Sequence, residues 1–138
     1  MNLRAAFLAR EAVNQPDGTF DIVGGGITDF HLQGGHVLGR PIRLTFAVVV
    51  RLELTAEEAG QLRPLQMVVM FEGRQIAPGT TVPLVARPVP NEPRLYHNVI
   101  MNMTIDVPGP GDGYLLFTWE AGLVSVPRLH FRVGQRPA

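Results

Sequence analysis

Histidines and the acidic residues near them are the side chains that could carry out chemistry in this 138-residue chain. Asp29, His31 and His36 lie close together in the sequence, and the two histidines flank Gly34 and Gly35. Imidazole and carboxylate groups ligate divalent metals, but a metal site needs three or four ligands that are oriented by further hydrogen bonds. We keep this trio as a weak metal-site hypothesis and favour an ordinary polar loop.

Three consecutive glycines, Gly24, Gly25 and Gly26, follow a short predicted strand over residues 20–23. Such a run can form an anion-binding nest or part of an oxyanion hole, usually at the start of a helix. The next residues, 27–32, show no helical pattern. The glycines therefore predict a bulge or a sharp bend where the chain changes sheet. A ligand or metal site that combines them with the His31–His36 loop is the alternative.

Most of the side chains used in nucleophilic catalysis are missing. Cys and Lys are absent, and Ser125 is the only serine, in a short strand without a nucleophile-elbow pattern. Glu57 and Glu58 are adjacent on one expected helical turn, so their carboxylates point apart. We expect a protein that is not an enzyme, with no catalytic residues and no cofactor.

The charge balance limits the classes of partner. Twelve basic residues, all Arg, face twelve acidic ones, which gives a formal net charge of zero. This balance argues against a nucleic-acid binder and against a polybasic membrane-surface protein. No apolar run is long enough to span a membrane, and Arg4 and Arg10 lie too close together for a signal-peptide core. The sequence fits a cytoplasmic protein.

Alternating apolar residues predict several β-strands. The clearest runs from Ile42 to Leu54, with Ala47 and Val49 making its second face locally apolar as well. Similar alternation covers residues 65–72, 95–107, 114–120 and 129–133. Between the first two strands, Thr55–Gly60 predicts one helical turn with Thr55 as its cap.

These short strands, separated by turn signals, predict one all-β domain over residues 1–138, an antiparallel β-sandwich. We favour an immunoglobulin-like topology, with a jelly-roll or a partly open barrel as the alternative. The proline-rich segment 78–94 is predicted to be an edge segment or an exposed loop. Tyr114 follows a Pro-Gly-rich turn and is the candidate for a tyrosine corner.

The strand from Tyr114 to Glu120 has apolar residues on both faces. Leu115, Phe117 and Trp119 share one face, whereas Tyr114 and Leu116 share the other. A sandwich buries one face of each strand internally, so a loop or a partner should cover the second. We expect a protein partner or self-association, with Leu115, Phe117, Trp119 and Met70 as interface candidates.

The order of several weak motifs resembles a bacterial domain of unknown function, family 6941. The motifs are Ala6–Ala9, Asp17-Gly18, Ile22–Gly26, Val50–Glu53 and Glu58–Gly60, then a Pro-Gly-rich turn before Tyr114 and a last Pro127–Phe131 strand. The turn at Phe71–Gly73 departs from the family pattern. The resemblance implies a small all-β bacterial domain and supplies no activity. We therefore expect a non-enzymatic interaction or structural module.

Overall fold

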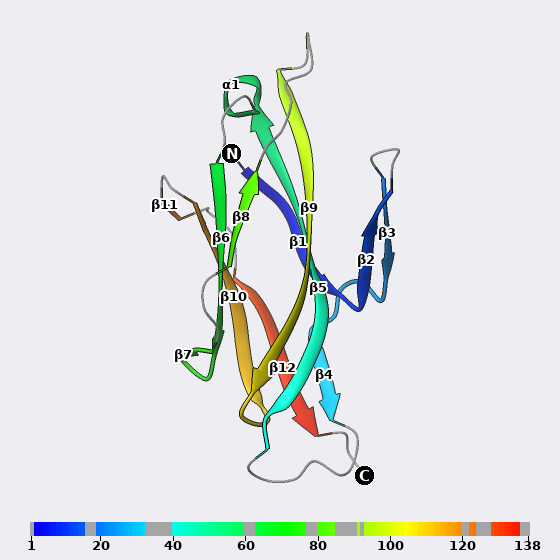
Figure 1. The fold of residues 1–138 in the computed structure, drawn as a ribbon, viewed down its shortest axis with the longest axis vertical. Helices are drawn as coiled ribbons and strands as arrows, with labels where there is room; N and C mark the ends of the chain where they lie inside the picture. The colour runs from blue at the N-terminus through cyan, green and yellow to red at the C-terminus, as the bar shows by residue number, and fades with distance from the viewer. Residues whose placement is uncertain are drawn as a thin grey trace.

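A computed structural model describes residues 2–15, 19–32, 40–59, 63–76, 80–84, 91, 93–119, 122–123 and 128–135. It confirms that the chain is predominantly β (Figure 1). The described strands form two larger sheets and one separate hairpin.

The smaller of the two sheets has three antiparallel strands in the order β1–β5–β9. Its strands are β1 (Asn2–Ala9), β5 (Ile42–Thr55) and β9 (Arg94–Val107). The long strand predicted from Ile42 is confirmed, and it pairs with β9 along its whole length, from Ile42 opposite Val107 to Thr55 opposite Arg94. Every second side chain of β5, starting at Ile42, is buried, as the alternation requires.

The larger sheet has seven strands, with a central order of β4–β12–β10–β6–β7. They are β4 (Asp29–Leu32), β6 (Arg63–Phe71), β7 (Arg74–Gln75), β8 (Thr80–Leu84), β10 (Gly111–Trp119), β11 (Gly122–Leu123) and β12 (Leu129–Gln135). β8 pairs with β6 and β11 with β10. β8 lies within the proline-rich segment, and residues 78–79, 85–90 and 92 of that segment lie outside the described part of the chain.

One pairing departs from the expected antiparallel arrangement. β4 runs parallel to β12, with Arg132 opposite Asp29 and Gln135 opposite Leu32. Antiparallel neighbours can be joined by a short turn, whereas β4 reaches this edge from another part of the fold. Its direction is therefore not set by a hairpin with β12.

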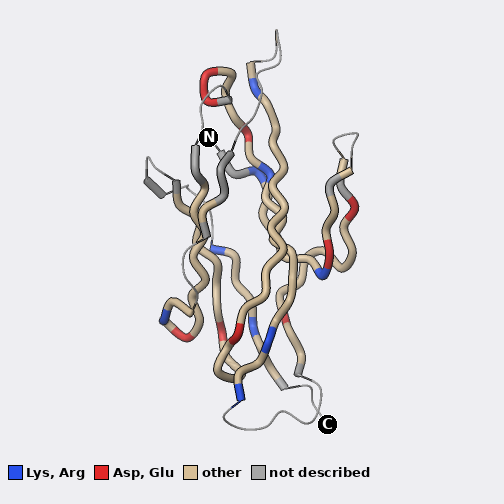
Figure 2. The backbone as a smooth tube through the Cα atoms, in the orientation of Figure 1, with Lys and Arg blue, Asp and Glu red and all other residues tan. Residues whose placement is uncertain are grey.

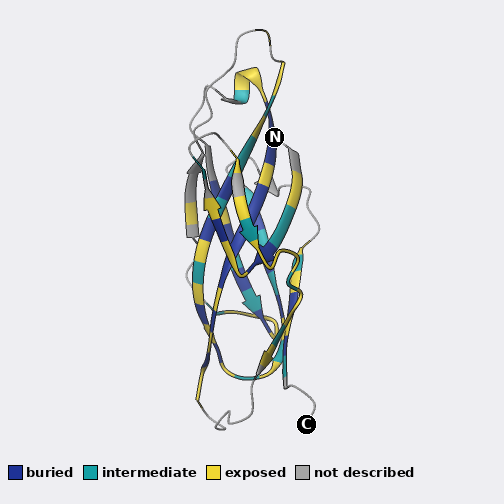
Figure 3. Cartoon of the chain, turned by 90° about the vertical axis from the view of Figure 1, so that its right-hand side faces the viewer, coloured by how far each residue is buried: buried dark blue, intermediate teal, exposed yellow. Residues whose placement is uncertain are grey.

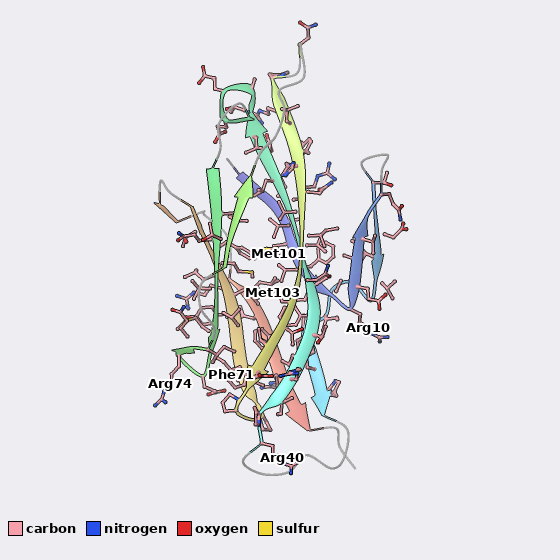
Figure 4. All side chains as sticks on the ribbon, viewed as in Figure 1. Arg10, Arg40, Phe71, Arg74, Met101 and Met103 are labelled. Carbon is pink, nitrogen blue, oxygen red and sulfur yellow. The ribbon has the colours of Figure 1, made fainter. Side chains whose placement is uncertain are left out.

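The two sheets share one hydrophobic core. Alternate residues of β5 and β9 face alternate residues of β6, β10 and β12, and almost all of them are buried. Figure 4 shows Phe71 and Met101 between the two sheets, and Figure 3 shows buried positions along the inner sides of both. Phe131 stacks against Phe71 with ring centroids 6.2 Å apart and meets Phe30 edge to face.

A hairpin of β2 (Glu11–Asn14) and β3 (Phe20–Val23) covers part of the other side of the smaller sheet. A second cluster forms beneath it, in which Ala12 and Ile22 of the hairpin pack with Ala47 and Val49. The prediction that this face of β5 is partly covered is thus confirmed, since Ala47 and Val49 are buried.

The three predicted bend glycines lie between the hairpin and β4. Gly24 and Gly26 have φ of 64° and 82°, a region that glycine enters without strain. The N–H groups of Gly26 and Ile27 both donate to the carbonyl of Leu8, at 2.8 and 3.0 Å. These bonds hold the bend against β1 and allow the chain to pass from one sheet to the other.

Gly25 differs from its two neighbours, because its φ is not positive. A Cβ at this position would lie 3.1 Å from Cγ2 of Ile22 and 3.4 Å from Cε2 of Phe7. The first of these contacts is tighter than an ordinary van der Waals contact, so a side chain here would press on Ile22 in the second cluster. Close packing, and not a left-handed backbone, therefore favours glycine at position 25.

The predicted helical turn is α1 (Ala56–Ala59). The backbone N–H of Glu58 donates to the Thr55 hydroxyl at 3.3 Å, and that of Thr55 donates to the Glu58 carboxylate at 3.0 Å. This reciprocal pair is a capping box, so Thr55 acts as the predicted cap.

Tyr114 is the fourth residue of β10. It lies opposite Met70 of β6 on one side and His130 of β12 on the other. Its role as a tyrosine corner stays a prediction.

Candidate functional site

The side of the seven-stranded sheet that faces away from the core carries a strip of half-buried apolar side chains. Met70 lies opposite Tyr114, and Val68 lies opposite Leu116 on the same two strands. All four are partly exposed, because the core takes the alternate residues of β6 and β10. We call Val68, Met70, Tyr114 and Leu116 the outer strip.

Cationic and polar groups border the outer strip at Tyr114. The guanidinium carbon of Arg128 lies 4.5 Å from the centroid of the Tyr114 ring, a cation–π contact. The His130 ring lies 5.8 Å from the same ring. Next to them, Arg132 pairs with Asp112 at 3.3 Å. The strip thus combines an aromatic and aliphatic centre with a charged border.

Two of the expected interface residues lie in the core instead. Leu115 and Phe117 are 0% and 2% exposed, so neither is available to a partner of the folded domain. Alternation along β10 places them inward and leaves Tyr114 and Leu116 on the outer side. Met70 lies in the outer strip. Trp119 pairs with Leu65 through its backbone, and its side chain lies outside the described part.

The histidine trio is only partly within the described residues. Asp29 and His31 are exposed on β4, two positions apart, and His36 lies outside the described part. Among the residues that the structure describes, no three His, Asp or Glu side chains are grouped to hold a metal ion. The N–H groups of Gly26 and Ile27 are already bonded to Leu8, so these two donors are not free for an anion.

A shallow depression of about 320 Å³ lies beside the outer strip, on the same side of the sheet. Polar side chains from three strands meet there, and Arg132 and Asp112 pair within it. Its lining residues are Thr28, Asp29, Asp112, His130, Phe131 and Arg132. The depression offers hydrogen-bond donors and acceptors, but it is too open to surround a ligand.

Sequence reasoning missed a buried carboxylate on the smaller sheet. Glu53 is 4% exposed and binds Arg94 at 2.8 Å and also Arg4. The register shift between Leu3 and Ala5 makes Arg4 the extra residue of a β-bulge, which directs its side chain to Glu53. The hydrogen bond from Arg4 is the largest cause that lowers the pKa of Glu53, with the charges of Arg4 and Arg94 acting in the same direction.

No local signal in the sequence identifies this ion pair. Glu53 is 49 residues from Arg4 and 41 residues from Arg94 in the sequence, so only the pairing of distant strands brings the three side chains together. The pattern of β5 does show Glu53 on the side away from the core, where an exposed residue would be expected. His97 differs from Glu53: it faces the core side opposite Leu52, and burial lowers its pKa.

Comparison with known proteins adds no assignment. No family model matches the chain, and no curated protein matches it. Within the described residues, no helix has the length and apolar character needed to cross a membrane.

Proposed function

We propose that this chain is a non-enzymatic interaction module that binds a protein partner through the outer strip. The observation that carries the proposal is the open side of the seven-stranded sheet, where Val68, Met70, Tyr114 and Leu116 form one half-buried apolar surface. Tyr and Arg are common anchors in protein interfaces, and Met adapts to irregular partner surfaces. Arg128 and His130 supply a polar border, as interfaces commonly have.

The finer fold assignment belongs to the same proposal. Two sheets that share one core support a β-sandwich that is antiparallel except for the pair β4 and β12, and an immunoglobulin-like topology is the version that we favour. Membership of the bacterial family 6941 and a cytoplasmic location are also proposals. They are supported by the order of the motifs and by the absence of Cys and of an apolar spanning run.

An affinity pull-down from the native host's lysate tests the interaction. Leu116→Asp places a charge in the centre of the outer strip, and Tyr114→Ala removes its aromatic anchor. Thr45→Asp places the same charge on an exposed residue of the smaller sheet and is the matched control. A specific protein that binds the wild type and Thr45→Asp, but neither strip variant, would support the proposal.

Folding of all variants is checked by circular dichroism before the comparison. If the strip variants are folded and retain the same bound proteins as the wild type, the outer strip is not the interface. Where Tyr114→Ala loses the bound protein, Tyr114→Phe separates the role of the ring from that of the hydroxyl, because a contact through the ring alone survives this change.

A second candidate function rests on the depression beside the strip. Its Asp, His and Arg side chains suit a small polar ligand, although it is shallow. A thermal-shift screen with divalent metals and small carboxylates or phosphates tests it, because a ligand that binds only the folded state raises the melting temperature. A shift that is lost in His130→Ala would support this function, and an unshifted melting temperature with every compound would reject it.

A further inference from the structure

The β2–β3 hairpin has a solvent-facing side that is both apolar and acidic. Its sheet-facing residues Ala12 and Ile22 are packed in the second cluster, so the alternate positions point away from the sheet. These positions pair across the hairpin and are all exposed: Glu11 with Val23, and Val13 with Asp21. Val13 and Val23 are 58% and 54% exposed. We call these four residues the arm face.

A basic patch lies on the same side of the smaller sheet, beyond the part that the hairpin covers. Tyr96 is 56% exposed there, and the guanidinium carbon of Arg51 lies 4.6 Å from the centroid of its ring. Arg4 and Arg94 flank them and are paired with the buried Glu53. Three Arg and one Glu leave a net charge of +2. We call Arg4, Arg51, Arg94 and Tyr96 the basic patch.

The arm face and the basic patch complement each other in both charge and apolar character. Val13, Val23 and Tyr96 are the large hydrophobic residues that are exposed among those the structure describes, and they lie on these two surfaces. Figure 2 shows acidic positions on both strands of the hairpin and basic positions on the upper part of the three-stranded sheet. Opposite charges around paired apolar centres are the pattern of a specific interface.

The two surfaces cannot meet within one chain. The hairpin already presents its other side to the sheet, so the arm face points away from the basic patch of its own chain. We propose that two copies of this chain associate, with the arm face of each docked on the basic patch of the other.

The placement of the two surfaces fits a twofold dimer. Ile100 packs against the hairpin cluster, and Tyr96 precedes it by four residues on β9, roughly 13 Å along the strand. Arm face and basic patch therefore lie side by side on one surface of the molecule. A twofold interface is self-complementary. A twofold axis that passes between the arm face and the basic patch therefore brings each arm face onto the basic patch of the other copy. Arg10 lies at the foot of the hairpin, away from its turn (Figure 4).

This inference does not rest on the proposed function, because it uses the opposite side of the molecule from the outer strip. The chain has no Cys, so single cysteines give site-specific cross-linking without background. Purified Val13→Cys is mixed with purified Arg51→Cys and treated with a short bifunctional maleimide. The expected product is a covalent dimer that contains one copy of each variant.

The matched control replaces Arg51→Cys with Thr45→Cys, which lies on the same strand and the same side but at the other end. A strong cross-link with Arg51→Cys and a weak one with Thr45→Cys supports the arm–patch contact. Equal cross-linking of both, or of neither, overturns it.

Sedimentation of the 138-residue chain over a range of concentrations provides the second measurement. Asp21→Arg on the arm face and Arg51→Glu on the basic patch should each raise the dimer dissociation constant by about tenfold or more, because each reversal places like charges together across the contact. Asp106→Arg, on the same side at the far end of β9, should leave it unchanged. A wild-type chain that stays monomeric, or a dimer that tolerates both reversals, overturns the proposal.

Discussion

At the scale of single residues, the buried carboxylate of Glu53 is expected to make stability depend on pH. Its pKa is lowered below the ordinary glutamate value of about 4.3, mainly by the hydrogen bond from Arg4. A lowered folded pKa contributes stability above the unfolded value, and this contribution is lost as the pH falls through the folded value. Glu53→Gln should therefore melt a few degrees below the wild type at pH 7, with the gap closing in acid.

Thermal unfolding of both proteins from pH 7 down to pH 3 measures this difference. Glu57→Gln, an exposed glutamate on α1, is the control and should follow the wild type throughout. Because Arg4 is half exposed, water weakens its interaction with Glu53, so the effect is modest. A gap that stays constant with pH would show that Glu53 acts through packing and not through its charge.

Gly113 is expected to be irreplaceable for a steric reason. A Cβ at this position would lie 2.4 Å from Cζ of Phe131 and 2.7 Å from the carbonyl oxygen of Met70. Gly113→Ala should therefore lower the free energy of unfolding by about 1–3 kcal/mol, as overpacked sites commonly do. Gly134→Ala is the control, since nothing lies within 4 Å of its added Cβ. Urea denaturation compares the two, and equal stabilities would contradict the packing at Phe131.

At the scale of elements, the bend at residues 24–26 decides how the hairpin and β4 are connected. Gly26 has φ of 82° with open space around its Cβ direction, so strain and not a clash should oppose a side chain there. Gly26→Ala should lower stability by about 1–2 kcal/mol. Gly109→Ala also meets open space but lacks a positive φ, and should be close to neutral. A neutral Gly26→Ala in urea denaturation would mean that the bend relaxes freely.

The sequence predicted elements well where one face of a strand is buried. β5 alternates over its full length, and the capping box of α1 follows from Thr55 and Glu58 three residues apart. The assignment of faces on β10 failed because Leu115 and Leu116 are both apolar, so alternation does not show which of them faces the core. The parallel pairing of β4 with β12 depends on a long-range contact that has no local pattern.

At the scale of the molecule, the candidate surfaces were harder to predict than the fold. The sequence predicted part of the outer strip, because it gave Met70 as an interface candidate and placed Tyr114 and Leu116 on a second apolar face. The sequence did not predict the basic patch, because its residues come from positions 4, 51, 94 and 96 on three strands. Their grouping also depends on the bulge at Arg4. Registers between distant strands decide such surfaces, and one sequence gives the strands without their registers.

The whole described fold is expected to unfold in one cooperative transition. The core cluster draws its side chains from both sheets, so neither sheet can keep its apolar face buried without the other. Leu115 is 0% exposed in this cluster, and Leu115→Ala should lower the free energy of unfolding by about 2–5 kcal/mol. Far-ultraviolet circular dichroism reports on the β-structure, and the single Trp gives an independent fluorescence signal. Both should shift together in the variant, whereas two separated transitions would mean that the sheets unfold independently.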